Sequence, residues 1–215
     1  MPISSAKVPR SDFAIMRNEL SKMNSDKIIL HLCATEGSDS LPYREAGYDV
    51  RLVGEDIGVE NFHPPENVYG IIANPPCTMF SIARTKAKTP MDLREGMRLV
   101  KECLRIIWEC QYRIIIDQQR IAPLKFWALE NPGSGFLRWF LGRPAFQYCQ
   151  SEYGANITKK TALWGDFNLP KRPLLSPQLT VGSTIGSKRE PTNHNMQTRS
   201  RCHINFAKVF FEANP

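Results

Sequence analysis

One short stretch constrains the fold of this chain more than any other. The apolar run from Val68 to Ala73 has the length and composition of a buried strand, and Asn74-Pro75-Pro76-Cys77 follows it at once. Proline has no backbone N–H to donate to a sheet, so the strand must end there and the chain must turn. The pattern predicts a strand whose carboxyl end presents Cys77 on a stiff turn.

Strand and helix patterns alternate along the rest of the chain. Apolar runs between turn signals indicate further strands at 27–33, 49–53, 126–129, 146–149 and 161–164, the last two as an antiparallel pair. Helices are expected at 41–46, from an N-cap at Thr89 with Pro90 in the first turn, at 136–141 and at 205–211. This alternation predicts an α/β fold built on a doubly wound, Rossmann-like sheet.

The 215 residues suffice for one domain with a full core. We expect a polar lead-in over residues 1–26 and a single catalytic domain over 27–213, in which 166–200 is a basic loop region. No apolar run is long enough to cross a membrane, and the first ten residues lack the apolar core of a signal peptide. Six cysteines without a Cys-x-x-Cys pair predict reduced thiols in the cytoplasm and no metal site.

Two strand ends carry the chemistry. The Phe126–Leu129 run is followed by Glu130-Asn131-Pro132, as the Val68–Ala73 run is followed by the turn with Cys77. In open α/β sheets, ligands bind at the carboxyl ends of the strands, which favours Cys77 as a nucleophile and Glu130 as an acid. Each residue has a structural alternative: a small core cysteine, and a surface or helix-capping carboxylate.

Together these two motifs resemble those of the cytosine-C5 DNA methyltransferase family, in a compact, phage-type form. Pro76-Cys77 with Phe80-Ser81 is similar to the nucleophile motif, and Glu130-Asn131 to the motif that contacts the base. Weaker similarities extend the resemblance over residues 27–213. The stretch His31 to Ser38 resembles the family's cofactor loop, and Glu55-Asp56-Ile57 resembles its acidic motif. Two further stretches, Tyr153 to Gly165 and Asn205 to Ala207, resemble later elements of the family. A Cys stands where methyltransferases of exocyclic amino groups have an aromatic residue, which favours attack on the ring.

The resemblance implies a fold of the S-adenosylmethionine-dependent methyltransferase type and modification of cytosine at C5, by default methyl transfer from S-adenosylmethionine, in DNA or a deoxycytidine nucleotide. Cys77 would add to C6, Glu130 would hold N3, and Asn131 would brace the loop. It implies cofactor contacts by Leu32, Cys33, Ala34, Gly37, Glu55, Asp56, Ile57, Asn74, Pro76, Asn205 and Phe206. It implies substrate contacts by Phe80, Ser81, Lys159, Lys160 and Thr161.

The cofactor loop departs from the family pattern at two positions. His31 stands where the family has an acidic residue, and Thr35 stands where it has a glycine that lets the backbone approach a ligand closely. His31 is also explained as a buried, hydrogen-bonded core histidine. Two alternatives therefore stay open: C5 modification or deamination of cytosine without S-adenosylmethionine, and a non-catalytic DNA-binding relative.

The positive charge is concentrated late in the chain. Of a formal net charge of +7, the segment 159–201 carries eight Lys and Arg residues against two acidic ones. Such a segment suits phosphate groups, although a solvated basic surface explains the charge equally well. Only about forty residues separate Trp164 from Asn205, too few for a base-reading domain, so backbone contacts without sequence preference are expected. The expected location is the cytoplasm, that of the host if a phage encodes the chain.

Overall fold

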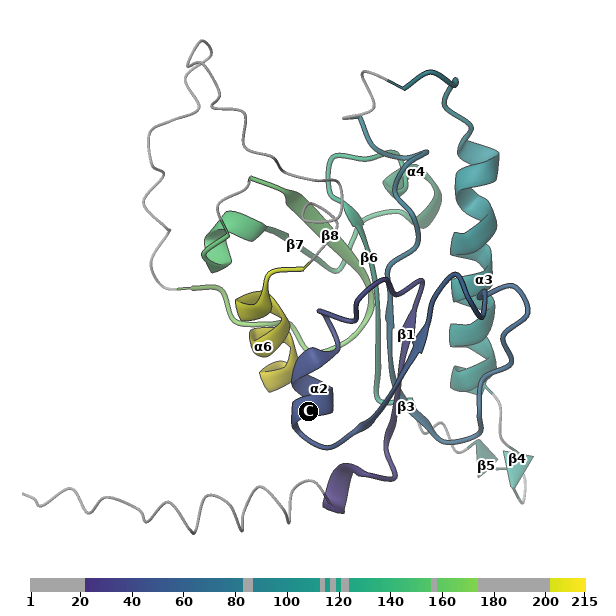
Figure 1. The fold of residues 1–215 in the computed structure, drawn as a ribbon, viewed down its shortest axis with the longest axis vertical. Coiled ribbons are helices and arrows are strands. Elements are labelled where there is room, and N and C mark those ends of the chain that lie inside the picture. The colour runs from purple at the N-terminus through teal and green to yellow at the C-terminus, as the bar shows by residue number, and fades with distance from the viewer. Residues whose placement is uncertain are drawn as a thin grey trace, which may run out of the picture.

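The computed structural model describes residues 22–82, 87–112, 115–116, 119–120, 124–155, 158–173 and 202–215. At its centre lies a six-stranded sheet in the order β2-β1-β3-β6-β8-β7 (Figure 1). The strands are β1 (Ile28–Leu32), β2 (Asp49–Val53), β3 (Val68–Ala73), β6 (Phe126–Pro132), β7 (Phe146–Cys149) and β8 (Lys160–Asp166).

The strand directions define where the fold can bind a ligand. Strands β2, β1, β3 and β6 pair in parallel, whereas β8 pairs antiparallel with both β6 and β7. The chain passes from β1 to β2 on one side and from β3 to β6 on the other, so the order reverses between β1 and β3. Ligands of open α/β sheets bind outside the carboxyl ends of strands at such a switch point. The predicted mixed α/β architecture is confirmed: the sheet is mostly parallel, forms one domain and is compatible with a Rossmann-like fold.

Helices cover the two faces of the sheet and give each its own apolar core. The long helix α3 (Leu93–Tyr112) packs Val100, Ile106 and Ile107 against one face. The helices α2 (Leu41–Glu45) and α6 (Ile204–Ala213) lie together over the other face (Figure 1). Their core is aromatic, with Tyr43, Phe126 and Phe210 in contact.

Some element boundaries differ from those predicted. The helix expected from Thr89 begins at Leu93, because Asp92 Oδ1 accepts the backbone N–H of Glu95 at 3.0 Å and acts as the cap. Strand β6 continues through Pro132 because its pairing with β8 extends to Thr161. The helix expected at 136–141 is shorter, α4 (Arg138–Leu141). The sequence did not indicate the 3₁₀ turn η1 (Gln150–Tyr153) or the small pair β4 (Ile115–Ile116) and β5 (Gln119–Arg120).

Most of the predicted lead-in and loop region lies outside the described residues. Only 22–26 of the lead-in and 166–173 of the basic loop region are described. In the ranges that are described, no helix combines the length and apolar character needed to span a bilayer.

Candidate active site

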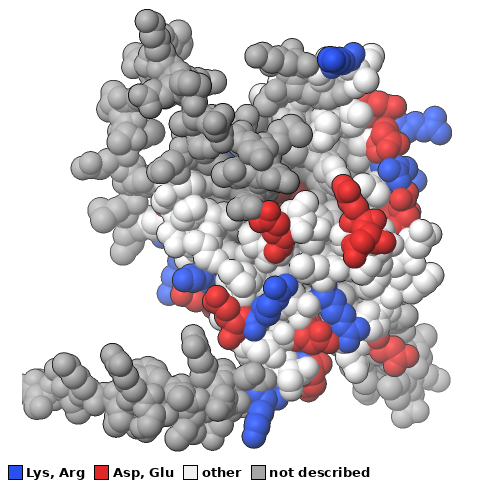
Figure 2. Space-filling view, in the orientation of Figure 1, with Lys and Arg blue, Asp and Glu red and all other residues white. Residues whose placement is uncertain are grey.

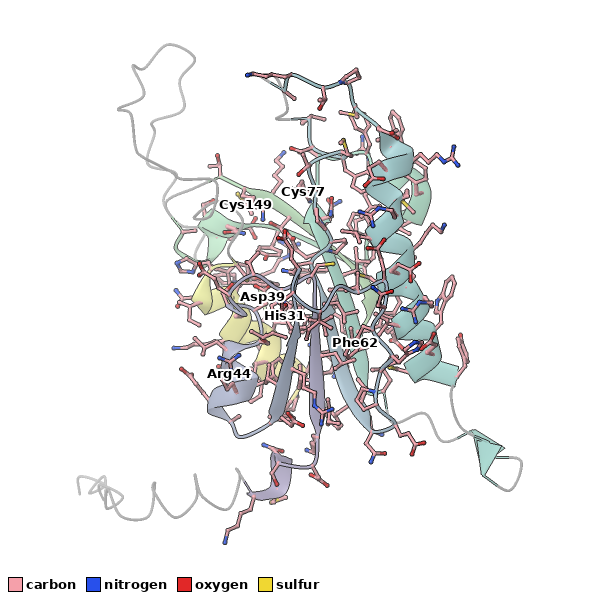
Figure 3. The ribbon with its side chains drawn as sticks, turned by 45° about the vertical axis from the view of Figure 1, so that its right-hand side comes forward. His31, Asp39, Arg44, Phe62, Cys77 and Cys149 are labelled. Carbon is pink, nitrogen blue, oxygen red and sulfur yellow. The ribbon has the colours of Figure 1, made fainter. Side chains whose placement is uncertain are left out.

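The turn that carries Cys77 is fixed at the carboxyl edge of the sheet. The Asn74 N–H donates to Leu32 O at 3.0 Å, which continues the β1–β3 pairing by one residue. The Cys77 carbonyl then accepts the N–H groups of Phe80 and Ser81, both at 2.9 Å, and the Phe80 side chain is fully buried. A buried ring and two backbone hydrogen bonds thus set the position of the half-buried Cys77 thiol. Figure 3 shows Cys77 at the upper end of the sheet.

Strand β6 places Glu130 and Asn131 beside this turn. Ala73 of β3 pairs with Leu129 of β6, so Glu130 lies one residue beyond the last pair, level with the start of the turn. The Asn131 Nδ2 donates to Pro75 O at 3.1 Å across the two strand ends. Asn131 is fully buried, and this bond ties the turn of Cys77 to the strand of Glu130.

Lys159 approaches from the opposite direction. Because β8 runs against β6, the residue just before β8 lies at the same edge as the carboxyl end of β6. The Lys159 Nζ is 3.2 Å from Glu130 Oε1, and only about a fifth of each side chain is exposed, 20% and 19%. The arrangement holds a thiol, a carboxyl group and an ammonium group at one place, each from a different segment.

These groups alter each other's proton affinity. Burial raises the pKa of Glu130, and the positive charge of Lys159 only partly offsets this. Burial also raises the pKa of the Cys77 thiol; Glu130 adds to the shift and Lys159 opposes it. Burial opposes the charge on Lys159, but the contact with Glu130 raises the pKa of its ammonium group. Near neutral pH the thiol keeps its proton, and Glu130 binds a proton more readily than an exposed glutamate does.

A small cavity opens beside Glu130, between the sheet and α6. Its volume is about 30 Å³, room for one water molecule, and its polar lining includes Asp39, Asn74, Glu130 and Lys159. In the described part of the chain, the Asp39 and Asn74 Oδ1 atoms are buried and have no hydrogen-bond partner. Buried polar atoms are nearly always satisfied in folded proteins. These two oxygens are therefore acceptors for a hydrogen-bond donor, which the cavity can admit as one water molecule or as a small part of a ligand.

Sequence reasoning did not identify Asp39 as a residue of the site. The Asp39 carboxylate accepts a hydrogen bond from Asn74 Nδ2 and lies 3.7 Å from His31 Nε2. The other ring nitrogen of His31 is 2.9 Å from Ser40 Oγ, which in turn donates to Gly37 O. Burial lowers the pKa of His31, so the ring is neutral near pH 7. His31 is thus a core histidine that holds the 37–40 turn under the site (Figure 3).

Most of the expected cofactor residues lie along the β2, β1 and β3 ends of the same edge. The chain leaves β1 through Cys33 in a left-handed conformation (φ 55°), and the Ala34 N–H donates to Val53 O at 3.3 Å. Glu55, Asp56 and Ile57 follow β2 and are exposed. The other members of this set are Leu32, Gly37, Asn74 and Pro76.

The two remaining cofactor candidates lie apart from this row, on the α6 side. The Asn205 Nδ2 donates to Tyr153 O at 2.9 Å, so its amide is used within the protein. The Phe206 ring is buried and stacks on Tyr148 with centroids 3.8 Å apart, where it also lines the small cavity. The structure therefore brings Phe206 near Glu130, while the Glu55–Ile57 turn lies at the opposite end of the row of strands.

The expected substrate residues are spread over different environments. Phe80 is core, Thr161 is buried with its Oγ1 unpaired in the described structure, and Lys160 is exposed. Ser81 follows Phe80 on the nucleophile turn and is half-buried. Lys159, also expected to contact substrate, pairs with Glu130.

The described part of the basic segment does not form a continuous cationic surface. Arg172 pairs with Glu152 at 3.1 Å, donates to Gln147 O at 2.5 Å and packs over the Phe146 ring. Basic and acidic side chains are interspersed over the described part of the face in Figure 2. Lys171 is exposed, and the other basic residues of the segment, Lys188, Arg189, Arg199 and Arg201, lie outside the described ranges.

Comparison with known proteins assigns no family: no protein-family model matches the chain, and no curated protein matches it.

All six cysteines are free thiols. Within the ranges that the structure describes, no three His, Cys, Asp or Glu side chains gather closely enough to hold a metal ion.

Proposed function

We propose that this protein modifies cytosine at C5, with S-adenosylmethionine as the methyl donor and DNA or a deoxycytidine nucleotide as the substrate. One observation carries the proposal. The adjacent ends of β3 and β6 present the Cys77 thiol and the Glu130 carboxyl group together, joined by the bond from Asn131 to Pro75. The similarity of both motifs to the cytosine-C5 methyltransferase family supports the same chemistry.

The reaction requires a nucleophile because C5 of cytosine is held in an aromatic ring. Addition of the Cys77 sulfur to C6 breaks the aromaticity and makes C5 nucleophilic. The displaced electrons move toward N3, where Glu130 donates a proton. After C5 has taken the methyl group, a base accepts the C5 proton, the Cys77 thiolate leaves C6 and the N3 proton returns to the Glu130 carboxylate, which restores the ring.

The proton affinities of the site suit these roles in part. The raised pKa of Glu130 favours the protonated acid that N3 requires. The raised pKa of Cys77 means that the thiol has to lose its proton before or during addition. Lys159 favours the first step, because its charge stabilises the thiolate, and it holds the Glu130 side chain in place. The same charge lowers the pKa of Glu130 and so works against its protonation.

The residues at the switch point fit the proposed cofactor. Bound S-adenosylmethionine would supply an electrophilic methyl group. The backbone of Cys33 and Ala34 would border it, and Glu55 and Asp56 offer exposed carboxylates to hydroxyl and amino groups. Asp39 Oδ1 and Asn74 Oδ1 are acceptors that lack donors in the described structure. The reaction would take place in the cytoplasm, where the free thiols stay reduced.

Analysis of modified bases in expressing cells tests this function. DNA and the nucleotide pool are reduced to nucleosides and examined by mass spectrometry, with Cys77→Ser as the control. We expect 5-methyldeoxycytidine in cells with the wild-type chain and none above background with the variant. If neither the DNA nor the nucleotide pool contains modified deoxycytidine, although wild type and variant are present at equal protein levels, the proposal is contradicted.

A further inference from the structure

The short helix α4 exposes two large aromatic side chains beside the candidate active site. Trp139 is 67% exposed and Phe140 is 48% exposed, although such rings are usually covered. Neighbouring exposed aromatic rings of this size mark a surface that contacts something else.

This helix is attached directly to the turn that carries Cys77. The Phe136 N–H donates to Phe80 O at 2.9 Å, and the Phe80 and Phe140 rings meet edge to face with centroids 6.3 Å apart. At its other end, Trp164 Nε1 donates to Gly142 O at 3.0 Å. Both ends are therefore fixed, and the exposed rings keep a set position relative to the nucleophile.

The charged residues that flank these rings in the chain have one sign. Arg138 and Arg143 flank Trp139 and Phe140 and are both exposed, and the segment 133–145 contains no Asp or Glu. Within the described ranges, neither arginine has a carboxylate partner. Arg172, by contrast, is paired with Glu152. The surface on α4 thus combines free guanidinium groups with exposed rings.

We propose that Arg138, Trp139, Phe140 and Arg143, here called the α4 surface, bind a DNA strand next to the reacting cytosine. A base adjacent to the target stacks on Trp139, and the arginines contact phosphates. The inference rests on the proposed function and extends it, because a free nucleotide supplies no neighbouring base. The area that two rings on a four-residue helix can bury is far below the roughly 800 Å² that each partner buries in a stable protein complex. This small area favours DNA over a protein as the partner.

Binding of a fluorescein-labelled, cytosine-containing single-stranded oligonucleotide tests the surface, measured by anisotropy. Loss of one base stack predicts that Trp139→Ala weakens binding about 5- to 150-fold. Trp108→Ala is the matched control: Trp108 is also exposed, at 57%, but lies toward the far end of α3. We expect the Trp108→Ala variant to bind the oligonucleotide with the affinity of the wild type.

The arginines give a second variant with a different readout. Arg138→Gln with Arg143→Gln should flatten the dependence of log K on log salt by about 0.7 for each lost phosphate contact. Equal affinity and equal salt slope in the aromatic and arginine variants would overturn the inference. So would wild-type dimers that Trp139→Ala converts to monomers, because the surface would then join two copies of the chain.

A separate measurement distinguishes failure of this inference from failure of the proposed function. Wild-type protein is incubated with S-adenosylmethionine and either 5-fluorodeoxycytidine monophosphate or an oligonucleotide that contains 5-fluorodeoxycytidine, and adducts at Cys77 are sought by mass spectrometry. An adduct together with Trp139-independent DNA binding overturns the α4 surface alone. DNA binding that depends on Trp139, without any adduct from nucleotide or oligonucleotide, supports the surface and overturns the proposed chemistry.

Discussion

The two halves of the candidate site are built in different ways. At the β3 and β6 ends, side chains contact one another: Asn131 bonds to Pro75, and Lys159 pairs with Glu130. At the β1 and β2 ends, backbone conformation defines the shape, through the left-handed Cys33 and the Ala34 to Val53 bond, while the acidic side chains stay exposed. The first half depends on residue identity and the second on the path of the chain. Substitutions should therefore be far more damaging in the first half.

Removal of the nucleophile should have the largest effect. Cys77→Ser replaces a thiol with a much poorer nucleophile and should lower the rate of cytosine modification more than about 1,000-fold. The half-buried position leaves room for the smaller atom, so thermal unfolding should hardly change. Cys149→Ser, another half-buried cysteine, is the control and should retain full activity.

Glu130→Gln removes the acid but keeps the shape of the side chain. Loss of proton donation to N3 should lower the rate about 100- to 10,000-fold. Without the Glu130 charge, the pKa of Cys77 should fall, so the thiol should react faster with iodoacetamide at pH 8. Slower modification of cytosine with faster alkylation of Cys77 would separate a chemical role from a purely structural one. Slower alkylation would contradict the electrostatic coupling between the two groups.

Lys159→Met tests whether the lysine belongs to the site or to a phosphate-binding surface. It leaves the largely buried Glu130 without its cation, which should lower the free energy of unfolding at pH 8 by about 3 kcal/mol. The neighbouring Lys160 is exposed, and Lys160→Met should change stability by less than about 0.5 kcal/mol. Equal stability of the two variants in urea unfolding would show that the Lys159–Glu130 contact is unimportant.

The pH dependence of Cys77 alkylation sharpens the same contrast. Iodoacetamide reacts with the thiolate, and the pKa of Cys77 lies above the ordinary thiol value of 9.0. The rate should therefore rise about tenfold per pH unit between pH 7 and 9, without levelling off in that range. Lys159→Met should move the midpoint upward and Glu130→Gln downward. The alkylation rate is measured by mass spectrometry of the Cys77 peptide. A rate that reaches a plateau below pH 8 would contradict a raised pKa of Cys77.

The smallest effect is expected in the backbone-defined half. Thr35 departs from the family pattern, but its side chain is exposed and neighbouring residues set the path of the loop. Thr35→Gly should therefore change the affinity for S-adenosylmethionine less than about threefold in calorimetry. A tenfold gain would show that the threonine obstructs the cofactor, and the contrast between the two halves would fail. Thr78→Gly, an exposed threonine on the nucleophile turn, serves as the comparison.

The sequence predicted features that depend on neighbouring residues better than contacts between residues far apart in the chain. The end of β3 was predictable because an apolar run closed by two prolines is a local signal, whereas β6 continues through Glu130-Asn131-Pro132 by pairing with β8. The start of α3 was placed wrongly at Thr89, because the Asp92 side chain caps the helix three residues later by accepting the Glu95 N–H. The contacts of Asp39 with Asn74 and of Lys159 with Glu130 join residues far apart in the chain. They depend on the antiparallel placement of β8 and the packing of a turn, which no local pattern encodes.

Covalent trapping shows whether Cys77 and Glu130 act together on the cytosine ring. Wild-type protein is incubated with S-adenosylmethionine and either an oligonucleotide or a nucleotide that contains 5-fluorocytosine. The fluorine at C5 cannot leave as a proton does, so the thiolate is not released. We predict an adduct with one of the two substrates that maps to Cys77, is absent in Cys77→Ser and forms at least 100-fold more slowly in Glu130→Gln. A wild-type protein that is folded, binds the substrate and yet forms no adduct with either would contradict the account.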